Sequence, residues 1–120
     1  MISTYRGLVL LAAAVVLASC TGSSPSTVPI DAEAAHQLML TGVNFTGILA
    51  PTDAWVEVAQ RGCREGAWDY DVAERLGQEA VDVIGSPLPA FAVWMLTVQA
   101  CHDRFPQDAL KKGPPPMPSG

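Results

Sequence analysis

Residues 86–104 read SPLPAFAVWMLTVQACHDR, and this stretch decides the fold because residues 90–98 are almost wholly apolar. Ser86 followed by Pro87 matches a favoured helix start, an N-cap and then proline at the first helical position. The spacing predicts a helix that runs to about Arg104. A helix that is apolar on nearly every side is typical of the centre of a bundle.

Three more helices are predicted upstream, each from a cap residue, an apolar stripe at helical spacing and a closing glycine. In chain order they run from Asp31 to Gly42, from Pro51 to Gly66 and from Asp69 or Asp71 to Gly85. Strand signals are few, because β-branched residues do not alternate with polar ones over any long run. The predicted fold class is therefore all-α, a small bundle of about four helices.

The first 20 residues read as an export signal. An apolar run at 7–18 follows the lone charge of Arg6 and is too short to span a bilayer as a helix. The run ends in Leu17-Ala18-Ser19-Cys20, which resembles the bacterial lipobox. That resemblance implies removal of residues 1–19 and a diacylglyceryl thioether on Cys20, which carries fatty acids such as palmitate. The alternative is an ordinary secretory signal in which Cys20 is incidental.

The charge balance of the chain is acidic. Seven basic and twelve acidic residues give a net charge of −5, and loss of Arg6 with the signal leaves −6. Nucleic-acid binding is disfavoured because it needs a basic face. The same charge does not draw the domain onto an anionic membrane. We therefore expect the lipid at Cys20 to provide the anchor, on the extracytoplasmic side of the cell membrane, with the domain standing away from the bilayer.

Composition divides the exported chain, whose length suits one domain, into three parts. Residues 20–29 comprise the lipidated cysteine and a flexible tether rich in Ser, Gly and Pro. Residues 30–109 form the helical domain. Residues 110–120 are predicted to be a disordered, proline-rich tail, because proline donates no backbone hydrogen bond. A docking peptide is the alternative interpretation of this tail.

With Cys20 assigned to lipid, an even pair of cysteines remains, which in an exported domain predicts a disulfide. Cys63 lies on the apolar stripe of the second helix and Cys101 on that of the last, so both face the core. The bridge would close a loop of about 39 residues, worth about 4 kcal/mol in the chain-entropy model. A metal or haem site, or a nucleophile, at Cys101-His102-Asp103 is the competing interpretation.

Spacing disfavours that alternative. Neighbouring helical residues point about 100° apart, and the chain has neither a CxxC nor a CxxCH motif. Because Gly-rich phosphate loops and GxSxG elbows are also missing, we assign no catalytic residue, metal or cofactor. Trp68 and Tyr70 lie in the turn before the third helix. They are the aromatic side chains expected to be exposed, and hence the candidate binding patch.

Several short motifs follow one another along residues 35–109. In chain order they are Thr41-Gly42-Val43, Pro51-Thr52-Asp53, Gly62-Cys63, the Gly66 turn, the Val72-Ala73…Leu76 helix and a closing Cys101. The pattern resembles a family of small exported actinobacterial domains, common in mycobacteria, the domain of unknown function 732 family. The resemblance implies the Cys63–Cys101 bridge and a source in an actinobacterial cell or one of its phages, but it transfers no functional residue. In this chain residues 102–105 separate Cys101 from Pro106, where the family often has proline directly after the cysteine.

Two classes of function follow. The first is a non-enzymatic cell-envelope lipoprotein, a membrane-tethered binding module with an envelope protein as partner. One version is a phage- or prophage-encoded protein that excludes superinfecting phage. The second is a carrier of a hydrophobic ligand such as haem or lipid, with Met39 and Met95 lining its site. An enzyme is least favoured. A filled core favours the module, and an apolar cavity of several hundred Å³ favours the carrier.

Overall fold

The computed structural model describes residues 28–117, so the predicted signal peptide, Cys20 and most of the predicted tether lie outside the described residues. The chain from 28 to 117 forms helices and no strand, which confirms the predicted all-α class. The elements in chain order are α1 (Ala32–Thr46), α2 (Thr52–Glu65), α3 (Tyr70–Glu79), α4 (Val81–Ile84), α5 (Ala90–Ala100), the 3₁₀ helix η2 (His102–Arg104) and α6 (Gln107–Lys112). None of these helices is long and apolar enough to cross a membrane.

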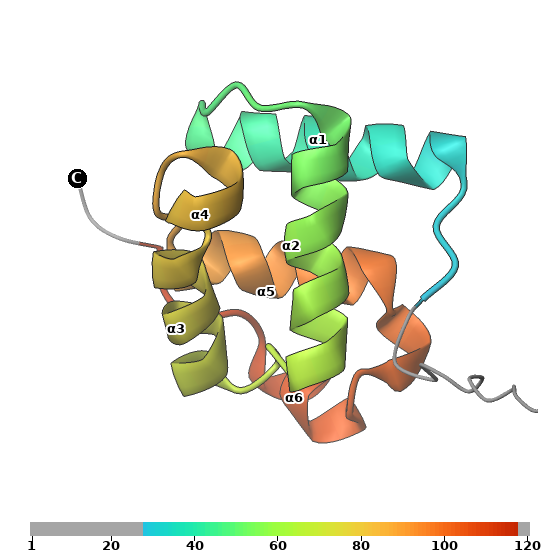
Figure 1. The fold of residues 1–120 in the computed structure, drawn as a ribbon. Coiled ribbons are helices and arrows are strands. Elements are labelled where there is room, and N and C mark those ends of the chain that lie inside the picture. Colours follow the sequence, from blue (N-terminus) through green and yellow to red (C-terminus); the bar gives the residue numbers. More distant parts are fainter. Residues whose placement is uncertain (1–27, 118–120) are drawn as a thin grey trace, which may run out of the picture.

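Helix α5 lies at the centre of the bundle, as its apolar sequence predicts. It contacts α1, α2 and α3. In Figure 1, α1 and α5 lie behind α2, which crosses both. The largest fully buried side chains come from these three helices; they are Leu38, Trp55, Val93, Leu96 and Thr97. The core therefore sits where α1, α2 and α5 meet.

Two glycines set how closely these helices approach. A Cβ added to Gly42 of α1 would overlap the indole ring of Trp55 on α2. A Cβ added to Gly62 of α2 would overlap the hydroxyl oxygen of Thr97 on α5. Close packing therefore depends on the missing side chain at both positions.

The predicted end of the first helix at Gly42 is wrong for this reason. Gly42 is buried inside α1, which continues to Thr46. The helix ends at Gly47, whose φ of 73° lies in the left-handed region that favours glycine. The Gly47 N–H donates to the Val43 carbonyl at 2.7 Å. Two glycines thus look alike in sequence, although one makes room for a ring and the other closes a helix.

The third predicted helix is found with one interruption. Asp69 is its cap, because its carboxylate accepts hydrogen bonds from the N–H groups of Asp71 and Val72 at 2.9 and 3.2 Å. The helix divides at Ala80 into α3 and α4. Gly85, with a φ of 89°, ends α4 as predicted.

The last predicted helix is shorter than 86–104 at both ends. Leu88 donates its backbone N–H to the carbonyl of Gly77 at 2.8 Å, so the chain before α5 is held against α3. Proline at 89 disfavours a helical conformation at Leu88, and α5 begins only after Pro89. At the other end, Cys101 leaves the α-helical region with a φ of −140°, and a single 3₁₀ turn follows.

The domain extends beyond residues 30–109 at both ends. Gln60 of α2 binds the backbone of Val28 twice: it accepts from the N–H at 3.0 Å and donates to the carbonyl at 2.6 Å. At the C-terminal end α6 continues to Lys112, and Pro115 is buried. Residues 110–112, which the sequence assigned to the tail, thus continue α6, and Pro115 is the buried residue of 113–117. Likewise, the last residues of the predicted tether are held by α2.

Candidate interaction surface

One face of the domain carries a broad apolar surface over α1 and α5. On α5, Phe91, Met95 and Val98 follow the spacing of one helix side and are only half-buried. Phe45 of α1 is 39% exposed and packs its ring against Phe91, with ring centroids 5.1 Å apart. We call these four residues the α1–α5 face.

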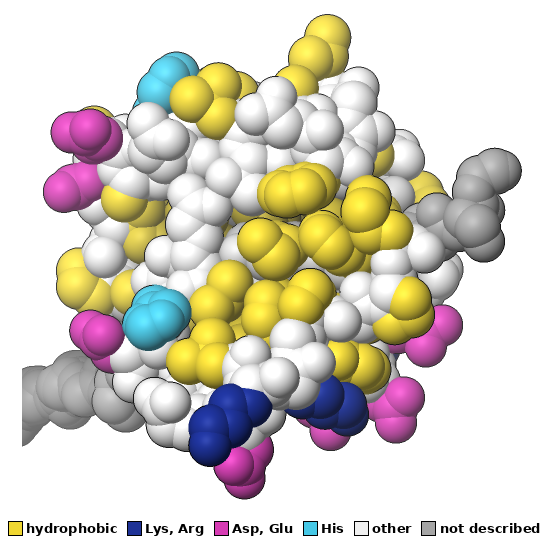
Figure 2. Space-filling model, turned by 180° about the vertical axis from the view of Figure 1, so that it is seen from behind, with side chains coloured by type: hydrophobic (Ala, Val, Ile, Leu, Met, Phe, Trp, Pro, Cys, Tyr) yellow, Lys and Arg dark blue, Asp and Glu magenta, His cyan; other side chains and the backbone are white. Residues whose placement is uncertain are grey.

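Figure 2 shows this side of the molecule, with hydrophobic side chains gathered at the centre and charged side chains at the edge. This surface was not predicted from sequence, because the apolar character of residues 90–98 indicates burial on every side. In the fold, α1, α2 and α3 contact α5, and its remaining side stays partly open.

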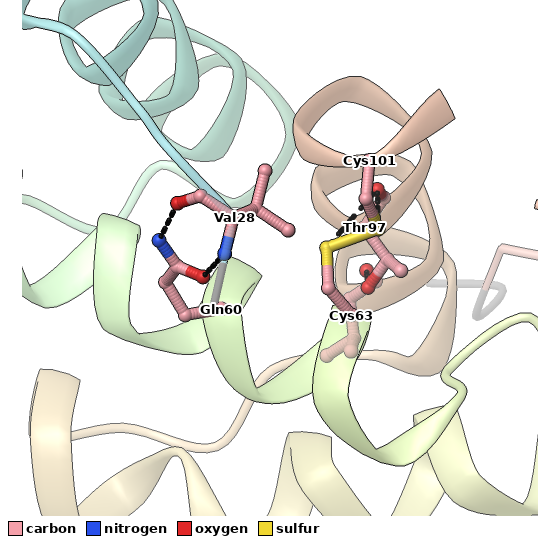
Figure 3. The surroundings of a disulfide bond; sticks show 6 residues. Val28, Gln60, Cys63, Thr97 and Cys101 are labelled. Atoms are coloured by element: carbon pink, nitrogen blue, oxygen red, sulfur yellow. Dashed lines mark hydrogen bonds between the residues drawn. A yellow bond between two sulfur atoms is a disulfide. The ribbon is translucent and has the colours of Figure 1, made fainter. Parts of the chain in front are cut away.

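The predicted disulfide between Cys63 and Cys101 is confirmed (Figure 3). It joins α2 to the end of α5 across a Cα–Cα distance of 6.1 Å, and both residues are buried. The sulfur atoms lie 3.9 and 3.1 Å from the Thr97 carbonyl oxygen, which they contact without donating because a disulfide has no S–H. His102 and Asp103 are exposed beside it. Among residues 28–117, no group of three His, Cys, Asp or Glu side chains is placed to hold a metal ion.

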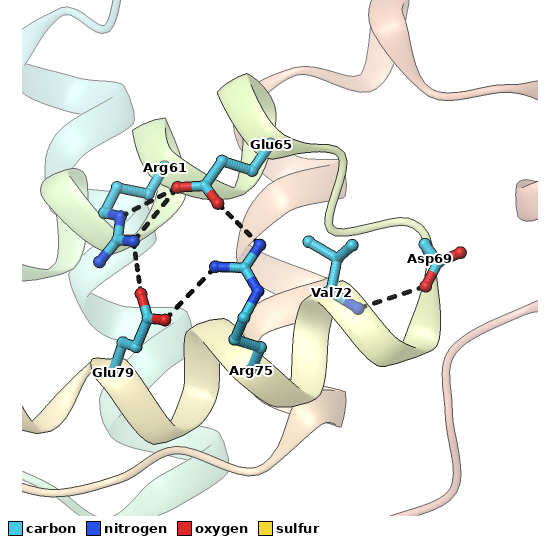
Figure 4. A network of polar contacts seen from close by, with 6 residues as sticks. All are labelled: Arg61, Glu65, Asp69, Val72, Arg75 and Glu79. Carbon is cyan, nitrogen blue, oxygen red and sulfur yellow. Dashed lines mark hydrogen bonds and ion pairs between the residues drawn. The ribbon is translucent and has the colours of Figure 1, made fainter.

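Four ion pairs form a closed ring that joins α2 to α3 (Figure 4). Arg61 contacts Glu65 and Glu79 at 3.2 and 2.6 Å, and Arg75 contacts the same two carboxylates at 2.8 and 3.4 Å. The hydrogen bond from Arg75 is the main cause that lowers the pKa of Glu65. For Glu79 the main cause of a lowered pKa is the hydrogen bond from Arg61. Each carboxylate meets two guanidinium groups, an arrangement that braces the two helices.

We expect the ring to make the domain less stable in acid. Both carboxylates have a folded-state pKa below the ordinary value of 4.5. Their stabilisation is therefore complete above that value and is lost as the pH falls through the lower folded-state pKa. The melting temperature of a Glu65→Gln, Glu79→Gln variant should fall less than that of the wild type between about pH 6 and about pH 3.

Glu74→Gln is the matched control, because Glu74 is an exposed carboxylate of α3 outside the ring. It should retain the acid sensitivity of the wild type. If the melting temperature of the double variant fell as much in acid as that of the wild type, the ring would have no part in acid stability. High salt should also weaken the effect, since the ring is partly exposed to solvent.

The structure places Trp68 against other aromatic rings of the domain. Trp68 is half-buried, and its ring meets Phe105 edge-on with centroids 5.5 Å apart. Phe105 meets Trp94 in the same way at 5.0 Å. The expected exposure of Trp68 is therefore found only in part. Sequence spacing gave no sign of Phe105, which lies beyond α5 and the 3₁₀ turn.

Tyr70 is half-buried beside the C-terminal end of the chain. Its hydroxyl donates to the carbonyl of Gly113 at 2.6 Å, across 43 positions of sequence. The ammonium group of Lys112 lies 4.2 Å from the centroid of the Tyr70 ring, within cation–π range. Both residues of the predicted patch are thus half-buried, and Lys112 and Gly113 of the same chain contact Tyr70.

The interior offers little space for haem or lipid. A pocket between α2, α3 and α4, lined by Val58 and Leu76, holds about 10 Å³, far less than the several hundred Å³ of a typical ligand pocket. A groove of about 420 Å³ is open to solvent and lies at the edge of the domain, along Val28, Pro29 and residues 99–104. Neither is an enclosed apolar space. Met39 packs against the core cluster, and Met95 belongs to the α1–α5 face.

Comparison of the chain with protein-family models, curated proteins and solved structures gives no match. The resemblance to the actinobacterial family therefore remains a prediction. Any function must be inferred from the surfaces of the domain itself.

Proposed function

We propose that this protein is a non-enzymatic cell-envelope lipoprotein that acts as a membrane-tethered interaction module. The α1–α5 face carries this proposal, because soluble domains seldom expose a contiguous apolar surface without an interaction to bury it. Its aromatic pair, Phe45 and Phe91, is the kind of anchor that dominates protein interfaces. The partner we propose is an envelope protein.

Charge favours a protein over the bilayer as the occupant of this face. The mature chain would carry a net charge of −6, which repels an anionic membrane surface. Apolar residues at the centre and charged residues at the rim, as in Figure 2, are the usual anatomy of a protein interface.

The proposed anchor limits how far the domain can move from the membrane. Gln60 holds Val28 against α2, so only eight steps of chain separate the body from Cys20. Fully extended, they reach about 28 Å. A module on so short a tether meets partners close to the membrane. Exclusion of superinfecting phage by a phage- or prophage-encoded protein is one form of this role, because it requires only that a membrane-proximal target be occupied.

Co-purification from envelope membranes tests the proposal. We expect Met95→Lys to reduce recovery of the partner at least tenfold, because a charge at the centre of an apolar interface costs more than about 1.4 kcal/mol. Val81→Lys is the control: Val81 is 46% exposed but lies on α4, outside the α1–α5 face. Both variants should keep the wild-type melting temperature. Equal recovery with the two variants would rule out the face as the binding site.

The anchor is tested in the same cells. Metabolic labelling with a fatty-acid analogue should mark the wild type and leave Cys20→Ala unlabelled. Labelling of both proteins to the same extent would refute the lipoprotein assignment, while the result with Met95→Lys would still report on the face.

A further inference from the structure

The C-terminal segment, residues 113–117, lies on the domain in a way that its sequence did not suggest. Residues 113–116 read Gly-Pro-Pro-Pro. Pro115 is buried, whereas Pro114 and Pro116 on either side are exposed. Figure 1 shows the chain leaving α6 and passing α3 on its way to the C-terminal end. The segment thus contacts the domain through one of three consecutive prolines.

The contacts resemble the way in which proteins recognise proline-rich peptides. Such peptides form an extended polyproline helix that docks on aromatic side chains, and its carbonyls accept hydrogen bonds from the receptor. Here the Tyr70 hydroxyl donates to the carbonyl directly before the first proline, and Lys112 lies over the Tyr70 ring. Pro115 is two residues further on, within about 7 Å of Gly113 along the chain.

We infer that the surface around Tyr70, next to the Trp68–Phe105 ring pair and here called the aromatic corner, is a receptor site for an extended proline-rich segment, occupied in cis by the chain's own segment through Gly113. Its partner is a proline-rich segment of another protein, which exchanges with the chain's own segment. This inference adds a second binding site to the proposed function and does not depend on the α1–α5 face.

The way the segment is held makes exchange feasible. Prolines at 114–116 have no N–H to donate, so the backbone of this stretch forms no hydrogen-bond ladder with the domain. Among the described residues, the segment is held by the hydrogen bond to Gly113 and the burial of Pro115, next to the cation–π contact of Lys112 in α6. Gly113 has a φ of 82°, a conformation that glycine adopts without strain and that directs the chain onto the domain.

The test uses the full chain and a dye-labelled peptide of sequence KKGPPPMPSG, which copies residues 111–120. Binding is followed by fluorescence anisotropy and by the indole N–H signal of Trp68 in NMR spectra. In the wild type the attached segment competes at a high effective concentration, so peptide binding should be weak. Pro115→Gly weakens the attached segment and leaves the aromatic corner intact. We expect this variant to bind the peptide at least tenfold more tightly than the wild type does.

Pro116→Gly is the matched control, because Pro116 is exposed; it should behave like the wild type. Gly113→Ala provides a second release of the segment, since alanine is strained at a φ of 82° while no atom obstructs its Cβ. Adding Tyr70→Phe to Pro115→Gly should weaken peptide binding again. Equal peptide affinity of the wild type, Pro115→Gly and Gly113→Ala, with all three folded, would overturn the inference. Binding that is unchanged by Tyr70→Phe, or by replacing the central proline of the peptide with glycine, would do the same.

Discussion

The double variant Cys63→Ser, Cys101→Ser is expected to lose about 2–5 kcal/mol of unfolding free energy relative to the oxidised wild type, the usual range for native disulfides in small secreted domains. The bridge spans 38 positions and joins α2 to the end of α5. These two helices contribute most of the buried hydrophobic side chains. Both residues are buried, so its loss also leaves two polar hydroxyls in the interior.

Urea denaturation of a protein that comprises residues 28–120 measures this loss. Reductant should destabilise the wild type to the level of the double variant and leave the double variant unchanged. Thiol titration of the unfolded, unreduced domain should find no free thiol. Two reactive thiols per chain, with melting unaffected by reductant, would contradict the bridge and revive the metal or nucleophile interpretation of Cys101 and His102.

Gly62→Ala is expected to cost about 1–3 kcal/mol, as overpacked cores do. Alanine inside a helix normally stabilises by about 0.5–1 kcal/mol over glycine. The sign of the change in unfolding free energy therefore distinguishes overpacking from the effect of helix propensity. The new methyl group would overlap the Thr97 hydroxyl. Thr97 is fully buried, and its hydroxyl donates to the Val93 carbonyl at 2.7 Å, so rotating it away would break that hydrogen bond.

A double-mutant cycle isolates this contact. Thr97→Ala removes the hydroxyl that the new methyl group would overlap. The loss of unfolding free energy in the Gly62→Ala, Thr97→Ala protein should therefore be smaller than the sum of the losses in the two single variants. Urea denaturation of the four proteins gives the coupling energy. Strict additivity would show that the close approach of α2 and α5 does not depend on the glycine. Gln78→Ala, at an exposed position of α3, controls for helix propensity and should be nearly neutral.

Local signals in the sequence predicted much of the fold. Pro51 and Gly66 bound α2, and Gly85 ends α4, because each acts through its own backbone conformation. The pairing of Cys63 with Cys101 also followed from sequence, since both lie on apolar stripes and no other described cysteine competes. Such features need no knowledge of what lies across the core.

The errors arose where a distant residue decides the outcome. Gly42 continues a helix because Trp55 lies against it, and nothing near Gly42 in the sequence reveals that ring. The candidate patch was predicted as an exposed pair, yet Tyr70 binds Gly113 across 43 positions. The apolar surface of α5 was missed for the same reason: residues 90–98 are apolar all round, and only the packed bundle shows which side is covered.

Photo-crosslinking from position 95 tests the proposed interaction most directly. A photoreactive residue replaces Met95 in the full chain, and in a second protein it replaces Val81; both are irradiated in envelope membranes. The α1–α5 face should yield a discrete protein adduct from position 95 that is absent from position 81. Adducts to lipid alone, or the same adducts from both positions, would contradict the assignment of this face to an envelope protein.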